Sequence, residues 1–412
     1  MKREKETTTR VPQVALIAPL DLKGSRSTIR GILDFAERHG PWFCSFLQGC
    51  PQERLLELAG ERDISGIIVT GLTKRGTSDI KAFHAPVVFV EPSPDMLAPD
   101  YPLKNVPWVG RDSYAIGVMA AEYYLDRGYT SFAWVGEPHG MYWSAERRRG
   151  FEETLAEAGF GCEVYDKSTK AEERSWLSEH DNDWRIAERG ELSRFLLGLP
   201  KPTAVFATMD GRARLVLAAC RNAGIKVPEE IAVLGVDNDP LLCGSTVPTL
   251  SSIHTGGYRR GQIAAEMLND LMHGGEPRER AVSMPPISVV TRGSTGYDAM
   301  KDPWLAKSIA FIRERASGGG IGVADIVKAA GCSRRYLERR FRKSLGRSVR
   351  EELLHERIEH VKSLLSSTNL TIGEITERSG FIGESHLGLL FRRATGMTMM
   401  GWRREHREAP DM

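Results

Sequence analysis

The stretch Val323–Gly346 reads VADIVKAAGCSRRYLERRFRKSLG, and its pattern predicts two short helices joined by a turn. Apolar residues at helical spacing form the inner face of each helix. Gly331 ends the first helix, and Ser333 can cap the second through its hydroxyl group. The outer face of the second helix is basic. This pattern indicates a helix-turn-helix, whose second helix can enter the major groove of DNA.

The same pattern recurs from Thr371 to Gly396, which reads TIGEITERSGFIGESHLGLLFRRATG. Between the two units, Val349–Ser366 predicts one amphipathic helix. About 18 residues of helix span roughly 27 Å, close to the ~34 Å between successive major grooves on one face of DNA. The duplication therefore favours binding to one stretch of duplex, whereas a single helical hairpin also occurs in many enzymes.

A basic helix is often only a solvated surface, so the distribution of charge along the chain matters. From Trp304 to the end, 20 Lys and Arg residues stand against 13 Asp and Glu, a net charge of +7. The preceding residues carry 36 against 41, a net charge of −5. The whole-chain charge of +2 therefore hides a basic tail, which is what phosphate binding requires.

Several motifs of the tail resemble the DNA-binding domain of the AraC/XylS family of bacterial regulators. They are Ser333–Phe341, the pair Gly380 and Phe381, and the later Phe391 and Gly396. The resemblance implies an all-α domain with two helix-turn-helix units at residues 304–408. With the basic faces, it predicts these DNA-contacting residues: Ser333, Arg334, Arg335, Arg339, Arg342, Glu384, Ser385, His386, Arg392 and Arg393.

The two units differ at the positions that would face the groove. The first offers Arg335 and Arg339, one turn apart, and both can donate to guanine in a bidentate manner. The matching positions of the second unit are Glu384 and Gly388. Our hypothesis is that the first unit supplies most of the sequence discrimination, while the second mainly holds phosphates through its closing arginine pair.

Size and composition bound the rest of the molecule. At 412 residues the chain predicts two or three domains, and 41% hydrophobic with 27% charged residues is typical of soluble globular proteins. No apolar run approaches the ~20 residues of a membrane helix, and the polar start does not resemble a signal peptide. Six scattered cysteines without CxxC spacing favour a reducing cytoplasm over a disulfide framework or a zinc site. We expect a cytoplasmic protein without a metal or cofactor.

The region before the tail alternates strands and helices, which predicts doubly wound parallel sheets. Residues 1–11 are expected to form a disordered leader, 12–295 the core, and 296–303 a linker. In the first half, strands are predicted at Val14–Ala18, Trp42–Leu47, Gly66–Thr70 and Val87–Val90. Helices are predicted at Ser27–His39 and Leu55–Glu61. The inner face of the first helix is expected to consist of Ile29, Ile32, Leu33 and Phe35. In the second half, Asp112 caps a helix to Leu125, and further elements are predicted at Phe132–Val135, Phe151–Ala158, Ala204–Ala207, Arg212–Ala223, Ile231–Val236, Gly261–Leu271 and Val289–Arg292. Asp166–Arg189 is predicted as a surface insertion.

Two such lobes in one chain commonly form a cleft that closes on a small ligand. The alternative is an enzyme with a Rossmann-type fold. The chain contains no GxGxxG, GxxxxGK[ST], GxSxG or HExxH motif. A binding protein without catalytic residues is therefore favoured over an enzyme.

Three stretches resemble the ligand-binding core of LacI-type repressors, whose fold is shared with periplasmic sugar-binding proteins. They are Trp108–Gly117, Ser144–Phe151 and Val227–Asp239. The resemblance implies ligand contacts from Asp112, Arg147, Asp210 and Asp237. Each residue also has a structural alternative: Asp112 can be a helix cap, Arg147 a helix-surface charge, and Asp237 a turn residue.

These residue types suit a polyol. Carboxylates accept hydrogen bonds from vicinal hydroxyls, and an arginine donates to sugar oxygens. Trp143 and Trp184 are the candidates for stacking on the apolar face of a sugar, although a Trp beside a helix is more often part of the core.

A LacI-type core followed by an AraC-type tail resembles the xylose operon regulator (XylR) family over nearly the whole chain. The stretches Arg30–Ile32, Gly40–Trp42, Gly235–Asp239 and Leu250–Ile253 fit that family. The resemblance implies a transcriptional activator that binds an operator in double-stranded DNA and responds to xylose or a related monosaccharide; an activator would also contact RNA polymerase. We expect a homodimer, because one small tail gives limited affinity at physiological salt and a linked second tail adds effective concentration. The alternatives are a repressor, a regulator of this type with a non-sugar effector, and a sugar-transport component, which would lack the basic tail.

Overall fold

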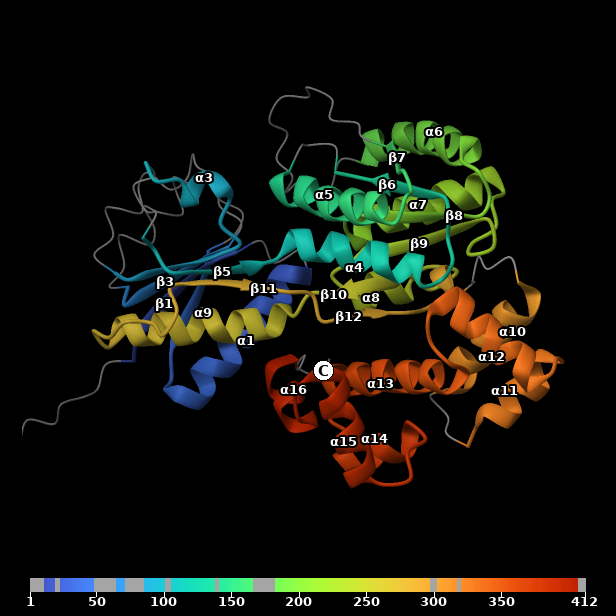
Figure 1. Cartoon of the computed structure of the whole chain (residues 1–412). Coiled ribbons are helices and arrows are strands. Elements are labelled where there is room, and N and C mark those ends of the chain that lie inside the picture. Colours follow the sequence, from blue (N-terminus) through green and yellow to red (C-terminus); the bar gives the residue numbers. More distant parts are fainter. Residues whose placement is uncertain are drawn as a thin grey trace, which may run out of the picture. The chain divides into compact units, whose positions relative to one another are not determined.

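The computed structural model describes residues 11–18, 23–47, 64–70, 85–100, 105–137, 141–165, 182–296, 302–316 and 320–406. The chain divides into two compact units (Figure 1). Unit 1 combines Met1–Arg111 with Gly257–Met284, and unit 2 combines Asp112–Gly256 with Pro285–Met412. Each unit contains one six-stranded sheet, and unit 2 also contains the helical C-terminal region.

The sheet of unit 1 is parallel in its described strands, in the order β11-β5-β4-β3-β1-β2. The strands are β1 (Gln13–Ile17), β2 (Phe43–Leu47), β3 (Gly66–Thr70), β4 (Val87–Val90), β5 (Trp108–Arg111) and β11 (Ala281–Met284). The described helices are α1 (Lys23–His39), α3 (Pro94–Leu97) and α9 (Gly257–Met272). Strands β1, β3 and β4 are nearly continuous buried apolar runs, as parallel strands covered on both faces require.

Helices α1 and α9 are in backbone contact at two glycines. A Cβ atom on Gly31 would lie 2.0 Å from the carbonyl oxygen of Tyr258, and one on Gly261 would lie 1.9 Å from that of Thr28. Leu33, which the sequence predicts to point inward, is 38% exposed, so that prediction is wrong. It lies about 100° around the helix from Ile32, outside the face that packs. That face contains Ile29, Ile32 and Ala36.

The sheet of unit 2 has the order β12-β10-β9-β8-β6-β7 and is parallel except for β12, which pairs antiparallel with β10. The strands are β6 (Phe132–Val135), β7 (Glu163–Tyr165), β8 (Thr203–Ala207), β9 (Ile231–Val236), β10 (Ser251–His254) and β12 (Ser288–Val290). The helices are α4 (Ser113–Leu125), α5 (Tyr142–Glu157), α6 (Asn182–Gly198), α7 (Asp210–Ala223) and α8 (Pro240–Gly244), with a 3-10 turn η3 at Gly293–Thr295. Residues of α4 and α5 enter one buried cluster with the sheet, and residues of α6 and α7 enter another. The predicted α/β class is confirmed.

Two predictions in unit 2 need correction. Helix α5 begins at Tyr142, not at Phe151, because its charged first half is stabilised by ion pairs one turn apart, such as Arg148 with Glu152 at 2.9 Å. Residues 182–189 of the predicted surface insertion belong to α6, and the rest of that insertion lies outside the described residues. So do the helix predicted at Leu55–Glu61, residues 1–10 of the leader and most of the linker.

The C-terminal region is wholly helical in its described part. Its helices are α10 (Pro303–Arg315), α11 (Val323–Ala330), α12 (Arg334–Leu345), α13 (Val349–Ser367), α14 (Ile372–Arg378), α15 (Glu384–Thr395) and α16 (Met399–His406). The glycines that end the helices of both units adopt left-handed φ values of 68° to 76°, which residues with a Cβ rarely adopt: Gly331, Gly346, Gly380 and Gly396. Phe341 of α12 and Phe391 of α15 are both fully buried at equivalent places. The two predicted helix-turn-helix units are confirmed.

Candidate DNA-binding and ligand-binding sites

Helix α12 presents the predicted basic surface. Its arginines Arg334, Arg335, Arg339 and Arg342 are exposed, and the hydroxyl oxygen of Ser333 accepts a hydrogen bond from the backbone of Tyr336 at 3.3 Å. Arg340, on the same helix, is instead paired with Asp302. The exposed arginines are free to reach bases or phosphates, and their DNA contacts remain a prediction.

Helix α15 presents a different surface at the equivalent place. Glu384, Ser385, His386, Arg392 and Arg393 are exposed, as predicted for contact residues. Between them, Gly388 has no side chain and Leu389 is 71% exposed. The middle of α15 is therefore apolar where α12 carries arginine, and its charge is confined to the two ends.

Helix α13 sets the spacing of the two units. Its 19 residues span about 28 Å, near the predicted length. Ser348 and Glu351 form a capping box at its start, and Val361 and Leu365 are fully buried in the cluster around α15. Because α13 is buried on its inner face and capped at its start, it holds the two helix-turn-helix units at a constant distance. Such an arrangement suits two units that bind one DNA duplex.

In unit 2, Arg147 and Trp143 lie together at the end of strand β8. Arg147 is 1% exposed and donates to the carbonyl oxygen of Thr208, directly after that strand. Its guanidinium group lies 4.8 Å from the centre of the Trp143 ring. The alternative that Arg147 is a helix-surface charge is therefore wrong. The side chain of Trp184 lies outside what the structure describes.

The loop after strand β9 places Asp237 at the same sheet edge, since β9 and β8 are parallel neighbours. Asp237 has φ +98° and Asn238 has φ +51°. Backbone strain of this kind persists only where surrounding contacts enforce it, and it clusters at functional sites. The amide oxygen of Asn238 accepts a hydrogen bond from Arg292 at 2.7 Å, and Thr255 donates to Asp237 at 3.4 Å.

Asp210 organises this loop from below. Its carboxylate is 1% exposed and accepts hydrogen bonds from the Ser252 hydroxyl at 2.6 Å and the Asp239 backbone at 2.7 Å. A Cβ atom on Gly235 would lie 2.4 Å from Asp210 Oδ1, so the glycine is needed for this approach. Asp210 therefore positions Asp237 through the loop, and a direct ligand contact by Asp210 remains a prediction.

Asp112 is the N-cap of α4, as one of its two interpretations requires. Its Oδ1 atom accepts a hydrogen bond from the backbone of Ala115 at 2.8 Å. Its side chain is only half-buried, so capping leaves a ligand contact open.

Two further polar groups at strand ends were not predicted. In unit 2, Glu137 after β6 lies 4.0 Å from the buried Arg212. In unit 1, Glu91 directly follows β4 and has a φ of +57°. Its carboxylate forms ion pairs with Arg111 at 2.8 Å and with Arg260, which is 1% exposed, at 3.0 Å. The sequence signal for such a group is an acidic residue directly after a buried strand, as in Val87–Glu91. The signal does not identify the arginine partners, which only the folded structure shows.

The described residues hold no group of three or more His, Cys, Asp or Glu side chains arranged for a metal ion. No helix in the described part of the chain is long and apolar enough to cross a membrane.

Two domain models match parts of the chain. Residues 121–295 match a periplasmic binding protein-like domain, and residues 326–405 match a helix-turn-helix domain. The xylose operon regulatory protein of Escherichia coli strain K12 is 32% identical over 309 residues, which are 74% of this chain and 76% of that protein. That of Haemophilus influenzae is 31% identical over 71% of this chain and 74% of its own length. A solved structure described as the xylose-binding transcription activator xylR aligns with a TM-score of 0.58 and 27% identity, over 97% of this chain and 100% of that one.

A periplasmic-binding-like core followed by a doubled helix-turn-helix defines a DNA-binding transcription regulator with a ligand-binding core. Its relatives are transcription regulators. The chain belongs to the family of xylose operon regulatory proteins.

Proposed function

We propose that this regulator is controlled by D-xylose or a related monosaccharide, and that unit 2 binds the sugar at the carboxyl ends of β6, β8 and β9. The single observation that carries the proposal is the buried Arg147, held against Trp143 at the end of β8. Asp237 projects from the neighbouring strand end. The names of the relatives favour a pentose.

The chemistry of these groups fits a sugar. A guanidinium group fixed by a carbonyl and an aromatic ring donates in a set direction, so little entropy is lost when it binds hydroxyl oxygens. The half-buried carboxylate of Asp237 accepts from hydroxyls, and Trp143 offers an apolar ring face. Asp112, Asp210 and Trp184 complete the proposed set of ligand residues.

Isothermal titration calorimetry with D-xylose, L-arabinose, D-ribose and D-glucose tests the proposal. We expect one pentose to bind, and Asp237→Ala or Trp143→Ala to weaken its binding at least ~10-fold, the loss expected for one charged or stacking contact. Arg149→Ala is the matched control, because Arg149 is an exposed arginine on the same helix, paired with Glu146 at 2.7 Å. Unchanged affinity in all the site variants would contradict this site.

We further propose that the protein acts in the cytoplasm as a homodimer without catalytic activity, activates transcription, and contacts RNA polymerase on its operator. Two linked tails raise the effective concentration of the second one, which supports tight binding at physiological salt. In-vitro transcription from a promoter that carries the selected operator, with and without D-xylose, distinguishes activation from repression by the sign of the response.

A further inference from the structure

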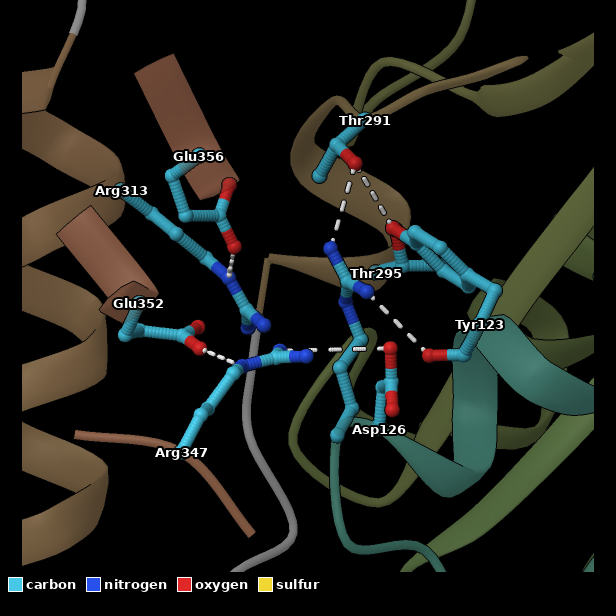
Figure 2. Close-up of polar contacts among 9 residues, drawn as sticks. Tyr123, Asp126, Thr291, Thr295, Arg313, Arg347, Glu352 and Glu356 are labelled. Carbon is cyan, nitrogen blue, oxygen red and sulfur yellow. Dashed lines mark hydrogen bonds and ion pairs between the residues drawn. The ribbon is translucent and has the colours of Figure 1, made fainter. Parts of the chain in front are cut away.

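Within unit 2, the C-terminal end of α4 and the residues on either side of β12 form a surface that α13 covers. We call this the docking surface and define it by Tyr123, Asp126, Arg127, Ile287 and Thr291. Arg127 is 6% exposed, and its guanidinium group lies 3.4 Å from the centre of the Tyr123 ring. Its Nη2 donates to the Thr291 hydroxyl at 3.3 Å, and the Tyr123 hydroxyl shares hydrogen bonds with Thr291 at 2.9 Å and Thr295 at 2.6 Å (Figure 2).

Helix α13 faces this surface with acidic residues. Glu356 is paired with Arg313 of α10 at 2.8 Å, and Glu352, which is 0% exposed, is paired with Arg347. Arg347 also lies 4.0 Å from Asp126 of the docking surface (Figure 2). Burial favours a raised pKa for Glu356, but the charges of Arg313 and Arg127 outweigh it and lower that pKa. The Glu356 carboxylate is thus ion-paired with Arg313 of the tail, and the positive charge of Arg127 lowers its pKa further.

An apolar contact lies beside the ionic one. Ile287, directly before β12, is 8% exposed and packs in one cluster with Ile358, Val361 and Leu365 of α13. The same cluster contains Phe391 of the second helix-turn-helix unit. The buried apolar contact and the half-exposed ion pair between Arg347 and Asp126 attach α13 to the docking surface at two places.

The other end of α4 lies at the proposed sugar site. Asp112 caps its first turn, and the helix of 13 residues runs about 20 Å to the docking surface. Helix α5, which carries Arg147 and Trp143, is in backbone contact with α4. A Cβ atom on Gly117 would lie 2.0 Å from the carbonyl oxygen of Arg147, and one on Gly150 would lie 2.2 Å from that of Tyr114. The two helices are therefore packed backbone to backbone, with no space between them for a side chain.

We propose that the α4–α5 pair carries the effector signal directly to α13 through the docking surface, which Arg127 organises by its contacts with Tyr123 and Thr291 and which holds the connector between the two DNA-binding units. This inference rests on the proposed function, because it takes a sugar as the effector. A movement of Asp112, Trp143 or Arg147 on binding shifts α4, and α4 shifts α13 with both helix-turn-helix units. Sugar binding then changes the orientation of the two helix-turn-helix units, while the structure within each unit stays the same.

The coupling is measured on the full chain with an operator selected in vitro by that chain. Operator affinity is determined by fluorescence anisotropy with and without saturating D-xylose, and the ratio of the two dissociation constants is the coupling factor. We expect a wild-type factor of about 5 to 150, and a factor near one for Arg127→Ala and for the isosteric Glu356→Gln. The exposed Arg221→Ala on α7 is the control and keeps the wild-type factor.

A double variant sharpens the result. If Arg127 and Glu356 act through one contact, the double variant loses no more coupling than either single variant, whereas independent effects would add. Wild-type coupling in both single variants, or additive losses, would overturn the inference. Glu356→Gln keeps the shape of the side chain, so it reports on the contact even if Arg127→Ala is unstable.

A readout without sugar separates this inference from the proposed function. Hydrogen exchange of the full chain should show faster exchange of α13 amides in Arg127→Ala than in Arg221→Ala. Equal exchange would overturn the docking itself. If wild-type operator binding ignores D-xylose while α13 still loses protection in Arg127→Ala, the sugar assignment fails and the docking surface stands.

Discussion

The two helix-turn-helix units share one backbone plan and differ in what their second helices expose. Both end in left-handed glycines and both bury a phenylalanine at the equivalent position of the second helix. Helix α12 exposes arginines along its length, whereas α15 exposes Glu384 first, then Leu389, and its arginine pair only at the end. The duplication therefore preserves the fold and leaves the surface free to differ, because buried positions carry the packing and exposed positions carry recognition.

The largest expected effect comes from removing the shared core. Phe341→Ala and Phe391→Ala should each lower the free energy of unfolding of the tail by about 3–5 kcal/mol, the usual cost of truncating a fully buried phenylalanine. Chemical denaturation followed by circular dichroism measures the change, with the 71%-exposed Leu389→Ala as control. If one of the two variants lost less than about 1 kcal/mol in free energy of unfolding, the two phenylalanines would not have equivalent roles in the cores of their units.

The next effect tests the difference in recognition. Arg335→Ala should weaken operator binding about 5- to 150-fold and relax the preference at one base pair, since a bidentate contact to guanine is worth about 1–3 kcal/mol. Glu384→Ala should change affinity far less. Anisotropy on the operator and on its single-base variants compares them. Intact preference in Arg335→Ala together with lost preference in Glu384→Ala would reverse the roles of the two units.

A smaller effect concerns phosphate contacts by the second unit. Arg392→Ala should weaken binding to all sequences alike and reduce the slope of log affinity against log salt by about 1, the expected result of losing one phosphate contact. Operator and unrelated DNA are titrated at several salt concentrations. A base-specific loss with an unchanged slope would assign Arg392 to a base edge.

The smallest effect comes from the helix caps. Ser333 caps α12 with its hydroxyl group, whereas the N-cap residue of α15 is Gly383, whose φ of −173° suits any residue. A Cβ atom at Gly383 would meet no atom within 4 Å. Gly383→Ser should therefore stabilise the tail by a few tenths of a kcal/mol, and Ser333→Gly should destabilise it by a similar amount. Thermal melts in parallel measure both, and a loss of stability in Gly383→Ser would show that its backbone is not free to accept a side chain.

Regular hydrophobic patterns made most of the fold predictable. The sequence predicts strand Ile231–Val236 with its observed bounds, and the tail glycines mark the helix ends. The sequence does not predict strand β10, because its residues Ser251 and Ser252 are polar, yet both are fully buried and hydrogen-bonded to distant partners. A polar residue can be buried when it has hydrogen-bond partners, and the sequence does not show where those partners lie.

The candidate sites divide in the same way. Arg147 and Asp237 can be named from the stretches that resemble the LacI-type core, Ser144–Phe151 and Val227–Asp239. The roles of Asp210 and Glu91 cannot be found this way, since their partners lie 20 or more residues away in the sequence. The contact between Asp126 and Arg347 joins two regions that no local pattern relates.

Unit 1 is made of two separated pieces of chain, and this has a consequence for synthesis. Helix α9 and strand β11 come from Gly257–Met284, yet α9 covers the apolar faces of α1, β3 and β4. During synthesis, the cluster around Ile32 cannot be completed until all of Asp112–Gly256 has been translated, because α9 follows that segment. At typical translation rates this takes on the order of ten seconds. During that time the growing chain exposes the apolar surface that α9 later covers, and exposed apolar surface favours aggregation.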